Sequence, residues 1–102
     1  MTQTKKNIAV LKKWLKENGV DYVENTKVRG VDMDIYIPKY WIAIHIGDDD
    51  AFFKATRGRF APFFIRETES EAKTVEKITN CCIMQMQQFQ RQFNSKKYGK
   101  KK

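Results

Sequence analysis

The sequence predicts a single small α/β domain (α+β), in which helices flank a mixed four-stranded sheet. Residues 5–18 and 69–93 place apolar side chains at helical spacing, whereas residues 31–47 alternate apolar and polar side chains as strands do. A chain of 102 residues, 41% hydrophobic and 13% aromatic, is long enough to bury one core. The expected order is a helix, three strands, a short helix, a strand and a long helix.

The first expected element is an amphipathic helix over residues 5–18, with Thr4 as its N-cap. Gly19 follows the last periodic position and predicts the end of this helix. Residues 20–24 predict a first strand, and the polar segment 25–30 predicts the turn after it.

A tight hairpin is predicted in residues 31–47, because both arms alternate and are rich in isoleucine. A two-residue loop at Lys39 and Tyr40 gives a register in which the numbers of paired residues sum to 79. That register places Asp34 opposite His45, the only histidine. An acid and an imidazole are therefore expected on one face of the hairpin.

After the hairpin, three consecutive aspartates (residues 48–50) lead into a short helix that is expected to end at Gly58. Residues 60–66 predict a fourth strand. Pro62 indicates either that this strand lies at a sheet edge or that the strand begins at the proline. Because proline cannot donate a hydrogen bond, a central position is excluded.

The final helix is expected over residues 69–93, with Thr68 and Glu71 as a capping box. Its apolar stripe over residues 84–93 extends beyond what a small sheet can cover. This stripe indicates either core packing or a contact with a second copy of the chain.

The formal net charge is +8, and the end of the chain carries most of it. We expect the folded domain to comprise residues 1–95. Residues 96–102, which include five lysines, are expected to form a disordered tail. Such a tail binds phosphate backbones without sequence preference, or only keeps the protein in solution. The adjacent Cys81 and Cys82 predict reduced thiols and a cytoplasmic protein, and no apolar run is long enough to cross a membrane.

The segment from Asp34 to Gly47 resembles the restriction-endonuclease-like, or PD-(D/E)xK, nuclease superfamily, with short members similar to very-short-patch repair endonucleases. In both, an aspartate precedes a proline, a turn and a buried strand that ends at a glycine. The later segment Pro62–Glu67 also looks similar. In the order of its elements the resemblance covers roughly residues 5–80, and it implies a nucleic-acid partner, DNA ahead of RNA.

The resemblance also implies Mg²⁺ or another divalent metal, which carboxylates hold beside the attacked phosphate. Asp34 matches the metal-ligating aspartate, but His45 and Gly47 stand where the family has an acid and a lysine. We therefore expect a catalytically degenerate relative that binds nucleic acid. The alternative is an active endonuclease with a shifted site, using Asp34, His45 and Lys54 for catalysis and Asp34, His45 and Asp48 for the metal.

Cations interleaved with phenylalanines predict the surface that contacts nucleic acid. The expected contacts are Lys27, Arg29, Lys54, Arg57, Arg59, Arg66, Lys96 and Lys97. Phe52, Phe53 and Phe60 either stack on bases or form core, with the cations as solvated neighbours. A further alternative is a small protein-interaction module that forms a homodimer through the final helix.

Overall fold

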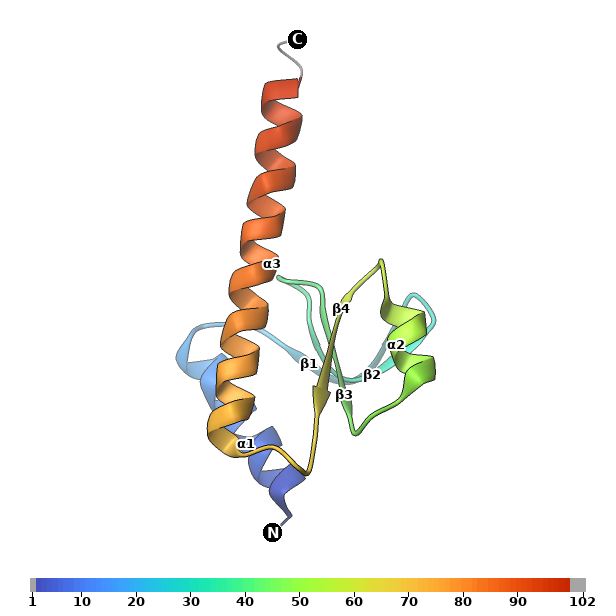
Figure 1. Ribbon diagram of the computed structural model, residues 1–102, viewed down its shortest axis with the longest axis vertical. Coiled ribbons are helices and arrows are strands. Elements are labelled where there is room, and N and C mark those ends of the chain that lie inside the picture. The colour runs from blue at the N-terminus through green and yellow to red at the C-terminus, as the bar shows by residue number, and fades with distance from the viewer. Residues whose placement is uncertain (1, 100–102) are drawn as a thin grey trace.

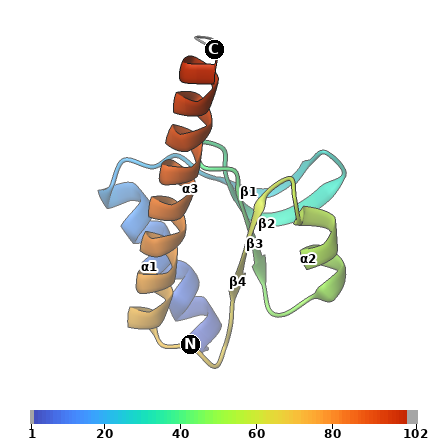
Figure 2. The same cartoon turned by 45° about the horizontal axis from the view of Figure 1, so that its top comes forward.

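The computed structural model describes the backbone of residues 2–99 and the side chains of residues 2–91. Its elements are α1 (Gln3–Glu17), β1 (Val23–Val28), β2 (Val31–Ile37), β3 (Ile42–Ile46), α2 (Asp50–Thr56), β4 (Ala61–Ile65) and α3 (Glu71–Gly99). Helices α1 and α3 lie side by side over one face of the sheet, and α2 lies on the other side (Figures 1 and 2). The predicted α+β class and element order are confirmed.

The four strands form one mixed sheet in the order β1-β2-β3-β4. The first three strands are antiparallel neighbours, and β4 runs parallel to β3 after the crossover through α2. Pro62 lies in β4, an edge strand, as its missing N–H group requires.

The β2–β3 register is the one predicted, because Ile35 pairs with Ile44 and Ile37 with Ile42. The connecting loop is longer than expected, however: β2 ends one residue earlier and β3 begins one residue later than predicted, so the loop comprises residues 38–41. Trp41 closes this loop with a φ of +55°. Proline has no N–H group to extend the ladder, so strand pairing ends before the loop that we predicted.

The first strand lies further along the chain than predicted, at Val23–Val28 instead of residues 20–24. The turn after it comprises only Arg29 and Gly30, which both have positive φ (52° and 81°), as in a type I′ hairpin. The turn residues and cations of segment 25–30 predicted a turn over its whole length, and the structure restricts the turn to its last two residues. Polar side chains fit β1 because it is an edge strand with mostly exposed positions.

Helix α1 begins earlier than predicted, and its N-cap is Thr2 instead of Thr4. The Thr2 hydroxyl accepts a hydrogen bond from the Lys5 N–H at 3.2 Å. Thr4 lies inside the helix, where its hydroxyl donates to Glu67. The predicted stop is confirmed, since Gly19 follows the C-cap with a φ of +65°.

Helix α3 is capped by Ser70, whose hydroxyl oxygen accepts the Lys73 N–H at 3.1 Å. The predicted capping box at Thr68 is therefore wrong, because the chain bends into the helix two residues later. The helix continues to Gly99, so residues 96–99 of the expected tail are helical. Residues 100–102 of that tail lie outside the described residues. No helix in the described part of the chain is long and apolar enough to cross a membrane.

The core is divided between the two faces of the sheet. On the side of α1 and α3, the largest fully buried side chains are Leu11, Leu15, Ile37, Ile42, Ile44, Ile65 and Ile78. On the side of α2, the buried residues are Val31, Met33, Ala43, Phe52 and Phe60. Phe52 and Phe60 are 6% and 8% exposed, so they belong to the core and do not offer rings to bases.

Candidate functional site

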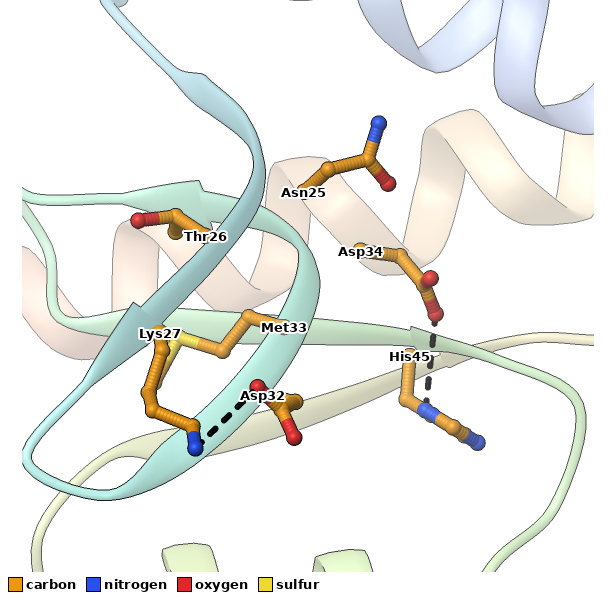
Figure 3. Close-up of a pocket in the computed structure, with 7 residues that line it drawn as sticks. All are labelled: Asn25, Thr26, Lys27, Asp32, Met33, Asp34 and His45. Atoms are coloured by element: carbon orange, nitrogen blue, oxygen red, sulfur yellow. Dashed lines mark ion pairs between the residues drawn. The ribbon is translucent and has the colours of Figure 1, made fainter.

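The structure brings Asp34 of β2 and His45 of β3 together on one face of the hairpin (Figure 3). Asp34 Oδ2 lies 3.4 Å from His45 Nδ1 and accepts a hydrogen bond from the Ile46 N–H at 2.8 Å. The second ring nitrogen, His45 Nε2, lies 3.8 Å from Asp49 Oδ2. The imidazole is thus held between two carboxylates, one from a strand and one from the N-cap of α2.

Aromatic packing fixes the orientation of the imidazole. The His45 ring stacks on Phe52, with centroids 4.8 Å apart and planes 24° apart. Phe64 presents its ring to His45 in an edge arrangement at 6.3 Å. The His45 side chain keeps 27% of its surface exposed, so the ring is immobilised but remains in contact with solvent.

An open hollow of about 370 Å³ lies beside this pair. It is lined by Asn25, Thr26, Lys27, Asp32, Met33, Asp34 and His45 (Figure 3). The sequence did not predict Asn25, Thr26 and Met33 as site residues, and the first two come from the segment that was predicted to be a turn. The Lys27 ammonium lies 3.9 Å from an Asp32 oxygen, so this predicted nucleic-acid contact is paired with a carboxylate.

The hollow does not fit the Mg²⁺ site that the resemblance implies. Asp48, the third predicted ligand, points elsewhere, and its carboxylate receives the Arg66 guanidinium at 2.7 Å. Lys54 is exposed on α2 and does not line the hollow. Within the described residues, no three His, Cys, Asp or Glu side chains are grouped so that they could hold a metal ion. Mg²⁺ takes oxygen ligands, whereas the Asp34–His45 pair offers one carboxylate and one imidazole, and imidazole suits transition metals better.

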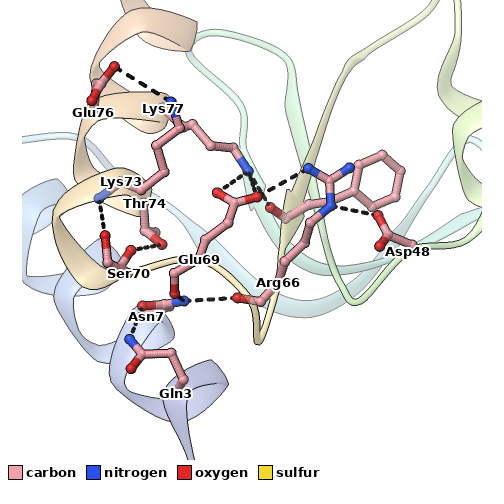
Figure 4. A network of polar contacts seen from close by, with 11 residues as sticks. Gln3, Asn7, Asp48, Arg66, Glu69, Ser70, Lys73, Thr74, Glu76 and Lys77 are labelled. Carbon is pink, nitrogen blue, oxygen red and sulfur yellow. Dashed lines mark hydrogen bonds and ion pairs between the residues drawn. The ribbon is translucent and has the colours of Figure 1, made fainter.

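Arg66 also differs from its predicted role, because two carboxylates hold its guanidinium (Figure 4). Hydrogen bonds with Asp48 and Glu69 raise the pKa of Arg66 above its ordinary value. Lys77 lies 2.9 Å from both Glu69 oxygens and also donates to the Phe64 carbonyl at 3.0 Å. Arg66 therefore organises the connection between β4 and α3 and is not a free cation.

Burial alone would raise the pKa of Glu69, but hydrogen bonds from Lys77 and Arg66 outweigh it, and the pKa falls below its ordinary value. The fully buried Asn7 of α1 reaches the same connection (Figure 4). Its amide nitrogen donates to the carbonyls of Arg66 at 3.0 Å and Glu69 at 2.9 Å. These contacts join α1 to the start of α3.

A second cluster lies at the other end of the parallel strands, and we call it the arginine–tryptophan surface. It consists of Arg29, Lys39, Trp41, Arg57 and Arg59, all of them exposed. They come from three loops: the β1–β2 turn, the β2–β3 loop and the α2–β4 loop (Figure 1). None of the residues in these loops (29–30, 38–41 and 57–60) is acidic.

Direct contacts join the three loops. Arg59 Nη1 donates to the Arg29 carbonyl at 3.4 Å, and Arg59 Nη2 donates to the Ala55 carbonyl at 2.7 Å. The Arg29 guanidinium lies over the Trp41 ring, 5.8 Å from its centroid. On α3, Phe89 meets the same indole edge to face at 5.9 Å. Sequence reasoning missed Trp41, because strand alternation gave it no role and nothing local revealed its exposure.

Charge is therefore separated along the strands. Asp48, Asp49 and Asp50 follow the end of β3, whereas the arginine–tryptophan surface gathers where β3 and β4 begin (Figure 1). Lys54 is exposed on α2. The side chains of Lys96 and Lys97 lie outside the described residues.

Together, the fold and the two clusters define a small α+β protein with a mixed sheet, an acidic histidine hollow and a basic aromatic surface. Comparison with models of protein families, with curated proteins and with solved structures finds no match.

Proposed function

We propose that this protein binds nucleic acid through the arginine–tryptophan surface, as a catalytically degenerate relative of the PD-(D/E)xK nucleases. The observation that carries the proposal is the gathering of Arg29, Arg57 and Arg59 in loops that contain no carboxylate. Two loops far apart in the sequence present these guanidinium groups to solvent, and none of the three forms an ion pair with a carboxylate of the described residues. Guanidinium groups bind phosphates in bidentate fashion and supply most of the sequence-independent affinity for nucleic acid.

The nuclease kinship is supported by the order of elements and by the position of one residue pair. The sequence predicted a mixed four-stranded sheet, and the hairpin register placed the candidate metal ligand Asp34 opposite His45, where these two residues lie. The donor set does not fit Mg²⁺, which favours binding without cleavage over an active endonuclease. Following the resemblance, we propose that the nucleic-acid partner is DNA in preference to RNA.

A cytoplasmic location belongs to the same proposal. Cys81 and Cys82 are free thiols, and Cys82 is buried. Reduced cysteines are typical of a reducing compartment.

The test is a double substitution, Arg29→Gln with Arg59→Gln, measured by equilibrium binding to DNA and RNA over a salt series. Each lost phosphate contact is expected to reduce the slope of log affinity against log salt by about 0.7–0.9. The matched control is Lys5→Gln with Lys6→Gln, which removes the same charge from exposed positions on α1. An equal loss of affinity in both double variants contradicts the proposal, because net charge alone would then explain binding.

A second candidate function is association of two copies through α3, because this helix exposes apolar side chains. Ile83, Met84 and Met86 are 42%, 66% and 42% exposed. Burying such side chains against a second helix would remove apolar surface from water. Sedimentation of the native chain and of a Met84→Gln, Met86→Gln variant tests this. A monomer at all concentrations in both proteins refutes the homodimer.

A further inference from the structure

We propose that Trp41 is a platform on which an unpaired base stacks, so that the ligand of the arginine–tryptophan surface is single-stranded nucleic acid. This inference rests on the proposed function and narrows its ligand. The bases of a duplex are stacked on each other, so an indole ring can reach a base face only where the strand is unpaired.

The first observation is the exposure of Trp41 beside a cation. Its surface is 46% exposed, although tryptophan is usually buried for most of its surface. The Arg29 guanidinium covers the ring at 5.8 Å, and Arg29 is itself exposed. A base can take the place of the guanidinium on the ring, while the guanidinium moves to the adjacent phosphate.

The second observation is the backbone conformation at the same residue. Trp41 has a φ of +55°, a region that glycine and asparagine occupy readily and bulky residues rarely do. A large aromatic residue in this conformation costs stability, and such strain persists mostly at functional positions. Glycine would close the same loop without strain, so the loop retains the indole at a cost.

The third observation is that the loop is held rigidly, so the ring is presented in one orientation. The Trp41 carbonyl accepts the Ala61 N–H at 2.8 Å. The preceding carbonyl, that of Tyr40, accepts the Gln85 side chain of α3 at 2.8 Å. A preorganised platform loses little freedom when a base binds, which favours affinity.

The fourth observation is the charge around the ring. Arg29 covers the Trp41 ring from the β1–β2 turn, and Arg59 of the α2–β4 loop donates to the Arg29 carbonyl. Lys39 lies in the same loop as Trp41, with its ammonium 5.5 Å from the centroid of the Tyr40 ring. On α3, no acidic residue follows Glu76. Cations close to an exposed ring match a strand whose phosphates alternate with bases.

A purely structural role for Trp41 is the competing explanation, because its contact with Phe89 helps to hold α3 against the loop. The test therefore uses Trp41→Leu, which removes the aromatic face, and Trp41→Phe, which keeps one. The matched control is Phe53→Leu, since Phe53 is an aromatic residue of α2 with 41% exposure. Each full-length variant is titrated with a thymidine homopolymer and with a DNA duplex over a salt series.

We expect Trp41→Leu to weaken single-strand binding by about 5- to 150-fold, with an unchanged salt slope, because stacking releases no counterions. Trp41→Phe should recover most of the affinity, and Phe53→Leu should lose none. The native chain should bind the homopolymer more tightly than the duplex. In a Trp14→Phe background, the oligonucleotide should quench the emission of Trp41, and in Trp41→Phe the emission of Trp14 should stay constant.

Equal affinity for the homopolymer and the duplex overturns the inference while leaving the proposed function intact. The same holds if Trp41→Leu binds like Phe53→Leu, or if it changes only the sedimentation of the protein. If the native chain binds no nucleic acid, both proposals fail. If Trp41→Leu does not fold, Trp41→Phe and the quenching measurement decide, since an unquenched Trp41 excludes stacking.

Discussion

Replacing Asn7 with alanine is expected to lower the free energy of unfolding by about 2–4 kcal/mol. The side chain is fully buried, and its amide donates to two main-chain carbonyls, those of Arg66 and Glu69, at 3.0 and 2.9 Å. Each bond contributes about 1 kcal/mol, and a carbonyl that loses its donor away from water costs about 1–3 kcal/mol. The Arg66 carbonyl keeps a second donor, the Glu69 N–H at 3.3 Å, so the expected loss lies in the lower part of the combined range. That loss is a large fraction of the roughly 5–15 kcal/mol by which a domain is stable.

The assay is urea unfolding, followed by tryptophan fluorescence and by circular dichroism. The control is Asn80→Ala, because Asn80 is an exposed asparagine of α3. Alanine is the better helix former at an exposed position, so the control should be neutral or slightly stabilising. A loss below about 0.5 kcal/mol for Asn7→Ala, within the range of ordinary surface substitutions, would refute the reasoning.

Three other outcomes are expected. Lys77→Met should destabilise the protein more at neutral than at acid pH: the lowered pKa of Glu69 contributes stability above the ordinary carboxyl pKa, and this is lost as pH falls through the folded value. Urea unfolding over that pH range measures it, and an equal loss at both ends contradicts it. Burial raises the pKa of Cys81 and Cys82 to about 11, so both thiols should react with a disulfide reagent far more slowly in the folded protein than after unfolding. Similar rates in both states contradict this. Asp34→Ala should leave nucleic-acid affinity unchanged; if the native chain cleaves plasmid DNA with Mg²⁺ or Mn²⁺ and the variant does not, the protein is an active nuclease instead.

Much of the fold could be predicted because its signals are local and periodic. The alternating isoleucines on both sides of Pro38 fixed the β2–β3 register, and with it the meeting of Asp34 and His45. The strand at Val23–Val28 was misplaced because an edge strand tolerates polar side chains, which lack a strand signature. Its real turn depends on two positive φ values at Arg29 and Gly30, of which only the glycine gives a sequence signal.

The surface clusters were harder to predict, because they depend on which loops lie side by side. The aspartate run was expected to cap α2, and Asp49 does so. The neighbouring Asp48 instead accepts a hydrogen bond from Arg66, which directly follows the end of β4. The indole of Trp41 meets Arg29 although the two residues are twelve positions apart in the sequence. Such contacts follow from the twist of the sheet and leave no periodic trace in the residues themselves.

The separation of acids and arginines at opposite ends of the parallel strands gives the molecule an electric dipole moment. A polyanion would turn the protein before the two touch, so that the guanidinium end leads and the aspartate end trails. Collisions would then be productive more often than random orientation allows. The association rate should thus exceed that of a protein with the same net charge spread evenly, and added salt should erase the advantage.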